Sequence, residues 1–228
     1  MSAEAQFNKA ILLIKDHQYD QAIKLLNSLS PSQSELIFKK SYLLALCFEK
    51  NNDINSSIKF YLEALKVNPN HLPTLFNLSS LYEVNNDYEM SIKLLKKCIL
   101  IENNFVEAKI NLSSLYLKTK NFISASKLLN EDFYLDVQLN LNKLYVLYEL
   151  RDHINFIQLA RKIKKNLNIM DPILKSNYYT MLGVYFHYFK KINLAEKFLK
   201  KSISYNDKSK AKKNLKEIQE MQILMHEL

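Results

Sequence analysis

The residues that could do chemistry are few and scattered. Cys47 and Cys98 share no motif, and we interpret them as small buried apolar residues. The five histidines form neither an HExxH motif nor a His/Cys metal spacing; they are His17, His71, His153, His187 and His226. The single glycine excludes Walker loops, dinucleotide-binding fingerprints and GxSxG elbows, which all need more than one. We therefore expect no catalytic residue, no metal and no cofactor, and a chain that is not an enzyme.

Length and composition are those of an ordinary soluble protein. The chain has 228 residues, of which 48% are hydrophobic and 24% charged, enough for one large domain or two small ones. One glycine and four prolines argue against a turn-rich β-sandwich or barrel. The N-terminus lacks the pattern of a signal peptide, and no apolar run approaches the ~18 residues of a membrane span. We expect a cytoplasmic protein.

One pattern recurs along the chain with a period of 34 residues. Copies that begin at Leu44, Leu78 and Leu112 align with shifts of 34, and further copies begin at Lys9, Leu144 and Leu182. Within each copy, apolar residues recur at three- and four-residue steps. This spacing predicts two amphipathic helices of about 12–14 residues, separated by a short polar turn. Asn and Asp in these turns suit a left-handed backbone.

The period divides most of the chain into six units. When each unit is numbered from 1, small residues fall at positions 8 and 20, and large residues fall at 11 and 24. The units are expected at residues 3–37, 38–71, 72–105, 106–137, 138–175 and 176–206. The fifth unit fits poorly, because this register gives it Tyr145, Ile157 and Arg161 at positions 8, 20 and 24. Either the superhelix kinks or changes pitch near residues 130–175, or the register of the repeat there differs from this one.

The pattern resembles the tetratricopeptide repeat (TPR) family. That family has small residues at 8, 20 and 27, large ones at 4, 11 and 24, and often proline at 32, where Pro69 falls in the second unit. The resemblance covers residues 3–206. It implies an all-α fold: a right-handed α-solenoid of about six helical hairpins, with the first helix of each hairpin lining a concave groove.

The last segment, residues 207–228, is expected to form a capping helix. Leu215 and Ile218 mark its apolar face, and terminal units of repeat arrays need such a cover. In the alternative interpretation, residues near the end of the chain dock on another copy or domain; these residues are Met221, Leu224, Met225 and Leu228.

Position 6 is the first candidate for ligand binding in the groove. It is occupied, in chain order, by Asn8, Leu43, Asn77, Asn111, Lys143 and Met181. An asparagine side chain offers a donor and an acceptor, so it can pair with a peptide backbone. The pattern is similar to the asparagine ladder in the repeat domain of O-linked N-acetylglucosamine transferase, matched here at Asn8, Asn77 and Asn111. Because the chain has 24 asparagines, chance placement is the alternative.

Aromatic residues precede several of these positions. Tyr42 and Phe76 lie at position 5, where a partly exposed ring could anchor a partner; packing between adjacent first helices is the alternative. The clamp with which some family members hold a C-terminal carboxylate is matched only loosely, at Asn111 and Lys143, and we reject it. The candidate groove residues are therefore Asn8, Tyr42, Phe76, Asn77, Asn111 and Lys143.

Positive charge is concentrated near the C-terminus. The net charge is +9, and residues 190–216 contain ten lysines and two acidic residues. The candidate basic patch comprises Lys190, Lys191, Lys197, Lys200, Lys201, Lys212 and Lys213. It could be a solvated face, or it could bind an acidic protein, an anionic membrane or nucleic acid. Nucleic acid is disfavoured, because no arginine-rich or RNA-binding motif accompanies the lysines.

The sequence favours a non-enzymatic scaffold or adaptor that binds a peptide or protein segment in its groove, with no cofactor. One alternative is a partner- or substrate-recruiting subunit of an enzyme complex, such as a glycosyltransferase system. Another is a basic adaptor for nucleic acid or an anionic surface.

Overall fold

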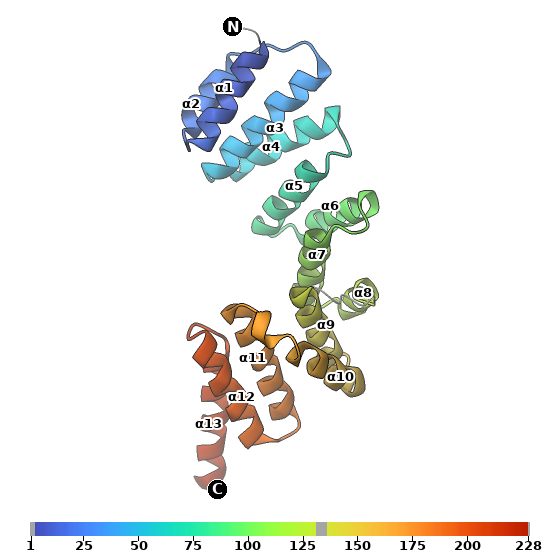
Figure 1. Cartoon of the computed structure of the whole chain (residues 1–228), viewed down its shortest axis with the longest axis vertical. Coiled ribbons are helices and arrows are strands. Elements are labelled where there is room, and N and C mark those ends of the chain that lie inside the picture. The colour runs from blue at the N-terminus through green and yellow to red at the C-terminus, as the bar shows by residue number, and fades with distance from the viewer. Residues whose placement is uncertain (1–2, 131–135, 228) are drawn as a thin grey trace. The chain divides into compact units, whose positions relative to one another are not determined.

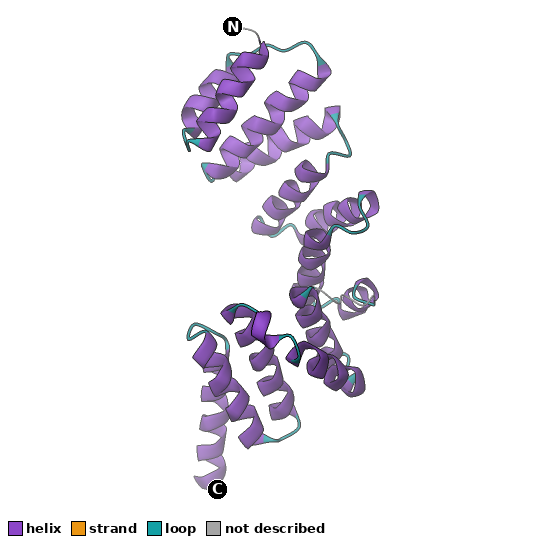
Figure 2. Ribbon diagram, in the orientation of Figure 1, coloured by secondary structure: helices purple, strands orange, loops and turns teal. Residues whose placement is uncertain are grey.

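The computed structural model describes residues 3–130 and 136–227, with side chains given to residue 220 and at Gln222. All regular structure in these ranges is helical, so the all-α prediction is confirmed (Figure 2). The helices are α1 (Ala3–Lys15), α2 (Tyr19–Asn27), α3 (Ser34–Lys50), α4 (Ile54–Val67), α5 (Leu72–Val84), α6 (Tyr88–Ile101), α7 (Val106–Lys118), α8 (Phe122–Leu128), α9 (Val137–Glu149), α10 (His153–Lys164), the 3-10 helix η1 (Leu167–Ile169), α11 (Pro172–Tyr188), α12 (Ile192–Tyr205) and α13 (Ala211–Glu227). None of the described helices is long and apolar enough to cross a membrane.

The helices form two compact units, residues 1–112 and 113–228, which we describe separately. In the N-terminal unit, α1 packs with α2, α3 with α4 and α5 with α6, and α2 and α4 also contact the first helix of the following hairpin (Figure 1). In the C-terminal unit, α9 packs on α8, α10 and α11, while α12 packs on α11 and α13. Each unit is thus a stack of helical hairpins.

Every hairpin turns through one residue in the left-handed region. These residues have φ between 55° and 61°, and they are His17, Asn52, Asn86, Lys120, Arg151 and Lys190. The residue that follows caps the second helix in four hairpins, where its side chain accepts the backbone N–H three residues on; the caps are Asp53, Asp87, Asn121 and Asp152. Since this geometry recurs, the left-handed residue marks position 15 of each of the six repeat units.

The left-handed residue corrects the register of the fifth repeat unit. Arg151 is the left-handed residue there, so the unit begins at residue 137, one residue earlier than the sequence pattern indicates. Position 20 is therefore Phe156 and not Ile157, and position 24 is Ala160 and not Arg161. By the same shift, position 8 is Leu144 and not Tyr145.

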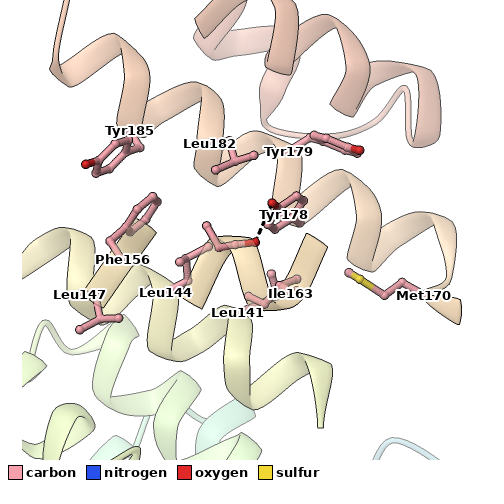
Figure 3. Packing of buried hydrophobic residues seen from close by; sticks show 11 residues of the cluster. Leu141, Leu144, Leu147, Phe156, Ile163, Met170, Tyr178, Tyr179, Leu182 and Tyr185 are labelled. Atoms are coloured by element: carbon pink, nitrogen blue, oxygen red, sulfur yellow. Dashed lines mark hydrogen bonds between the residues drawn. The ribbon is translucent and has the colours of Figure 1, made fainter. Parts of the chain in front are cut away.

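The sequence register failed because this unit reverses the usual order of bulk. Phe156 and Leu144 are fully buried at positions that carry small residues in the other units. Ala160 takes the place of the usual large residue, and its carbonyl accepts a hydrogen bond of 2.9 Å from the Tyr178 hydroxyl (Figure 3). The Phe156 ring stacks on Tyr185 with centroids 4.0 Å apart.

Helix α13 packs against the preceding hairpin. Ala211 and Ile218 are buried with Ala195 and Leu199 of α12, and Leu215 packs at their edge. The side chains invoked for docking on another copy or domain lie outside the described residues; they are Met221, Leu224, Met225 and Leu228.

Candidate functional site

Asn77 lies on α5 within a hydrogen-bond chain that joins three helices. Its Nδ2 donates to the Tyr61 hydroxyl on α4 at 3.1 Å, and that hydroxyl donates to Oε2 of Glu49 on α3 at 2.7 Å. The Tyr61 ring is fully buried. Burial, followed by the neighbouring Glu49, raises the pKa of Tyr61 well above its usual range, so the hydroxyl remains a neutral donor. Asn77 is held in place, while its Oδ1 accepts no hydrogen bond from the described residues.

Tyr42 belongs to an aromatic cluster beside this chain. Its ring stacks on Phe38 at 5.9 Å and lies 5.3 Å from His71 and 6.0 Å from Tyr61. Burial, and secondarily Glu49, raises the pKa of Tyr42. Phe38, Tyr42 and His71 are half-buried, so this aromatic cluster keeps part of its surface open.

The other N-terminal candidates differ in how they are held. Phe76 is half-buried and lies 5.0 Å from Phe105, so part of its ring serves packing. Asn8 is exposed on α1. Asn111 is half-buried on α7, and its side chain makes no hydrogen bond to the described residues. Of the three asparagines, Asn77 and Asn111 combine partial burial with unused hydrogen-bonding capacity.

The fifth unit does not continue this row. Position 6 there is Asn142, so the prediction that Lys143 occupies it is wrong by the one-residue shift. Asn142 is buried, its Nδ2 donates to Ser113 Oγ at 2.7 Å and Ser114 Oγ at 3.2 Å, and its Oδ1 accepts from Gln138 at 3.0 Å. With these bonds made, its amide has little capacity left for a ligand.

Lys143 lies in a cavity between helices of the C-terminal unit. The cavity measures about 390 Å³, and its walls come from α9, α10 and the end of the α8 segment, with Lys162 and Asp152 among them. Lys143 therefore faces second helices of the repeat. It does not share the position of Asn77 and Asn111.

The structure divides the candidate basic patch into two groups. Three lysines have carboxylate partners: Lys200 with Glu196 at 3.0 Å, Lys212 with Asp207 at 3.7 Å and Lys213 with Glu217 at 3.8 Å. Within the described residues, the other four have no carboxylate partner; they are Lys190, Lys191, Lys197 and Lys201. Two of the pairs, Lys200 with Glu196 and Lys213 with Glu217, join residues four apart on one helix, a spacing that the sequence already contains.

In the N-terminal unit, His71 caps the start of α5, and this cap depends on pH. Its Nδ1 accepts the Thr74 N–H at 3.3 Å, which requires an unprotonated nitrogen, and burial lowers its pKa. Well above pH 6.5, the ordinary pKa of histidine, the His71 side chain is neutral in both the folded and the unfolded state. Below that value the unfolded state binds the proton more readily, so we expect a loss of up to about 1 kcal/mol of stability as the pH falls. Urea unfolding at high and low pH measures it.

The matched variant for this prediction is His71→Asn, which keeps a capping oxygen without a titratable group. The difference in unfolding free energy between the wild type and this variant isolates His71 from other titrations. If that difference is the same at both pH values, the cap does not titrate as expected.

Part of the chain matches a known repeat family. Residues 41–71 and 72–105 each match the family model of the tetratricopeptide repeat. These residues include Tyr42, Tyr61, Phe76 and Asn77. Among curated proteins, no match to the sequence was found.

Several solved structures share the fold at low sequence identity. PilF of Pseudomonas aeruginosa has a TM-score of 0.67 at 15% identity, with 96% of this chain and 97% of that chain covered. A MamA protein has a TM-score of 0.63 at 19% identity, covering 75% and 93%. YrrB, described as a TPR protein with an unusual peptide-binding site, has a TM-score of 0.61 at 14% identity, covering 78% and 91%.

Proposed function

We propose that this chain, a tetratricopeptide-repeat protein, is a non-enzymatic scaffold that binds an extended segment of a protein partner through its N-terminal unit. Proteins of this family are generally interaction scaffolds, and YrrB, which shares the fold, has a peptide-binding site. We expect the scaffold to act in the cytoplasm and without a cofactor.

The pair Asn77 and Asn111 carries this proposal. The two residues lie 34 positions apart, at the same place in the consecutive first helices α5 and α7. Both are half-buried, and each keeps an amide oxygen that no described residue uses. A repeated amide of this kind can accept and donate to the backbone of a bound segment without selecting its side chains.

The aromatic cluster provides a place for a side chain of the same segment. The rings of Phe38, Tyr42 and His71 are partly exposed, and partly exposed aromatic rings often contribute strongly to binding at protein interfaces. These rings favour an anchor that is aromatic or positively charged, and the negative charge of Glu49, which acts on Tyr42, favours a positive one further. Asn8 is exposed and bonded to no described residue, and we assign it a secondary role at most.

We also propose that α13 caps the array. Ala211 and Ile218 cover apolar side chains of α12 that would otherwise face water, and an array of stacked hairpins needs such a cover for solubility. We keep the repeat units and the cap at the residues expected from the sequence, except that the fourth unit ends at residue 136 and the fifth begins at residue 137.

The test replaces both asparagines and measures partner binding. The immobilised chain captures partners for identification by mass spectrometry, and affinity is then measured for the wild type and for Asn77→Ala/Asn111→Ala. We expect the double variant to bind at least about fivefold more weakly, the loss of one or two net hydrogen bonds. Recovery of an enzyme, such as a glycosyltransferase, among the partners lost would assign the chain a recruiting role.

The control is Asn103→Ala/Asn193→Ala, which removes two exposed asparagines from other positions. It should bind like the wild type. Thermal unfolding shows whether each variant keeps its fold. Unchanged affinity in a folded Asn77→Ala/Asn111→Ala variant rules out backbone binding by these amides.

A further inference from the structure

The two compact units differ sharply in charge. Residues 1–112 contain 12 basic and 12 acidic side chains, whereas residues 113–228 contain 20 basic and 11 acidic ones. The whole net charge of +9 therefore belongs to the C-terminal unit. This excess says where an acidic partner would be attracted, but a site also needs side chains held in position.

Helices α11 and α12 hold two lysines in a crossed arrangement with two tyrosines. Tyr179 of α11 and Tyr205 of α12 stack with their rings parallel and centroids 5.8 Å apart. Lys201 of α12 lies 4.7 Å from the centre of the Tyr179 ring, and Lys175 of α11 lies 5.7 Å from the centre of the Tyr205 ring. Each lysine thus rests on the tyrosine of the other helix.

The same lysines lack acidic partners. Neither Lys175 nor Lys201 has a carboxylate within salt-bridge distance in the described part of the chain, nor does Lys197, one turn before Lys201. Hydrogen bonding to Tyr179 raises the pKa of Lys201, so it stays protonated. Lys175 and Lys201 are held against tyrosine rings, and Lys197 lies one turn away on α12. Lys200, Lys212 and Lys213, by contrast, have carboxylate partners.

We propose that the lysine–tyrosine face, formed by Lys175, Tyr179, Lys197, Lys201 and Tyr205, binds an acidic segment of a partner protein. Carboxylates of the segment pair with the three ammonium groups, and the exposed part of the Tyr205 ring contacts its apolar atoms. This site is separate from the N-terminal asparagines and does not depend on the function proposed for them.

The geometry favours a protein segment over nucleic acid. Single strands bind by stacking successive bases on exposed aromatic faces, usually with arginine. Here Tyr179 is only 6% exposed, Tyr205 is 37% exposed, and residues 190–216 contain no arginine. The face offers several cations but only one ring for stacking, which suits a run of carboxylates.

The test uses the full chain and a fluorescent peptide of about twelve residues rich in Asp and Glu, with anisotropy measured at about 50 mM and 200 mM salt. We expect Lys175→Gln/Lys201→Gln to weaken binding about tenfold at low salt. The control Lys212→Gln/Lys213→Gln removes the same charge from lysines with carboxylate partners and should weaken binding by less than about twofold. Lys175→Arg/Lys201→Arg, which keeps both cations, should retain binding.

Equal weakening in the two glutamine variants would overturn the proposal, since charge alone would then explain binding. Tighter binding of single-stranded oligonucleotides or phosphatidylserine vesicles than of the peptide, lost in Lys175→Gln/Lys201→Gln, would overturn it in favour of those partners. Asn77→Ala/Asn111→Ala should leave peptide binding at this face unchanged, which separates this test from that of the groove.

Discussion

Replacing Phe156 by alanine is expected to lower the free energy of unfolding by about 3–5 kcal/mol. The ring is fully buried and stacks on Tyr185 with centroids 4.0 Å apart and planes 5° from parallel (Figure 3). It belongs to a tightly packed cluster of buried side chains, so truncation opens a cavity that these neighbours can close only in part. Urea unfolding followed by circular dichroism measures the loss, and Ile154→Ala, at an exposed position of the same helix, should change stability by less than about 0.5 kcal/mol.

A second substitution tests the reason for this loss. The other units place a small residue at position 20 and a large one at 24, so Phe156→Ala/Ala160→Leu recreates their order in the fifth unit. Ala160→Leu alone overpacks the core and should cost about 1–3 kcal/mol. If bulk has been exchanged between the two positions, the double variant loses less than the sum of the single variants, by about 1 kcal/mol or more. Strictly additive losses would mean that the positions are independent.

This exchange explains what the sequence could and could not predict about the fold. Alternation of small and large residues predicts the hairpins, and the left-handed residue falls at position 15 of the predicted register in five units of six. In the fifth unit a search for small residues at 8 and 20 fails, because Leu144 and Phe156 occupy them. The turn was the better guide: Asp152 caps α10 as Asp87 caps α6, and aligning these two residues gives the correct register.

The candidate site shows a different limit. Spacing alone identified Asn77 and Asn111, but Tyr61 was not among the candidate groove residues. In the structure, the Tyr61 hydroxyl accepts a hydrogen bond from Asn77 on α5 and donates one to Glu49 on α3. This link holds the Asn77 side chain close to Glu49. Such links join residues on three helices, and no periodicity encodes them. Asn142 shows the opposite case. It is an asparagine at position 6, but its side chain is hydrogen-bonded to other residues of the protein and is not open to a ligand.

Enlarging Gly183 is expected to have the other large effect, a loss of about 1–3 kcal/mol for Gly183→Val. This glycine lies at position 8 of the last unit, in the middle of α11. A Cβ atom there would lie 2.6 Å from both Cγ and Cδ2 of Leu199, a fully buried side chain that has little room to move. The contact is closer than real Cβ atoms show, so the two helices must separate or Leu199 must leave its rotamer.

The series Gly183→Ala, Gly183→Val and Gly183→Leu distinguishes packing from helix propensity. Alanine adds the clashing atom but gains up to about 1 kcal/mol of helix propensity over glycine, so its net effect should be a small loss. Valine and leucine add further atoms against Leu199, and stability should fall steeply beyond alanine in urea unfolding. A stability gain across the series would show that α11 and α12 are not in close contact at this point. That result would contradict the close packing at position 8 from which the repeat was inferred.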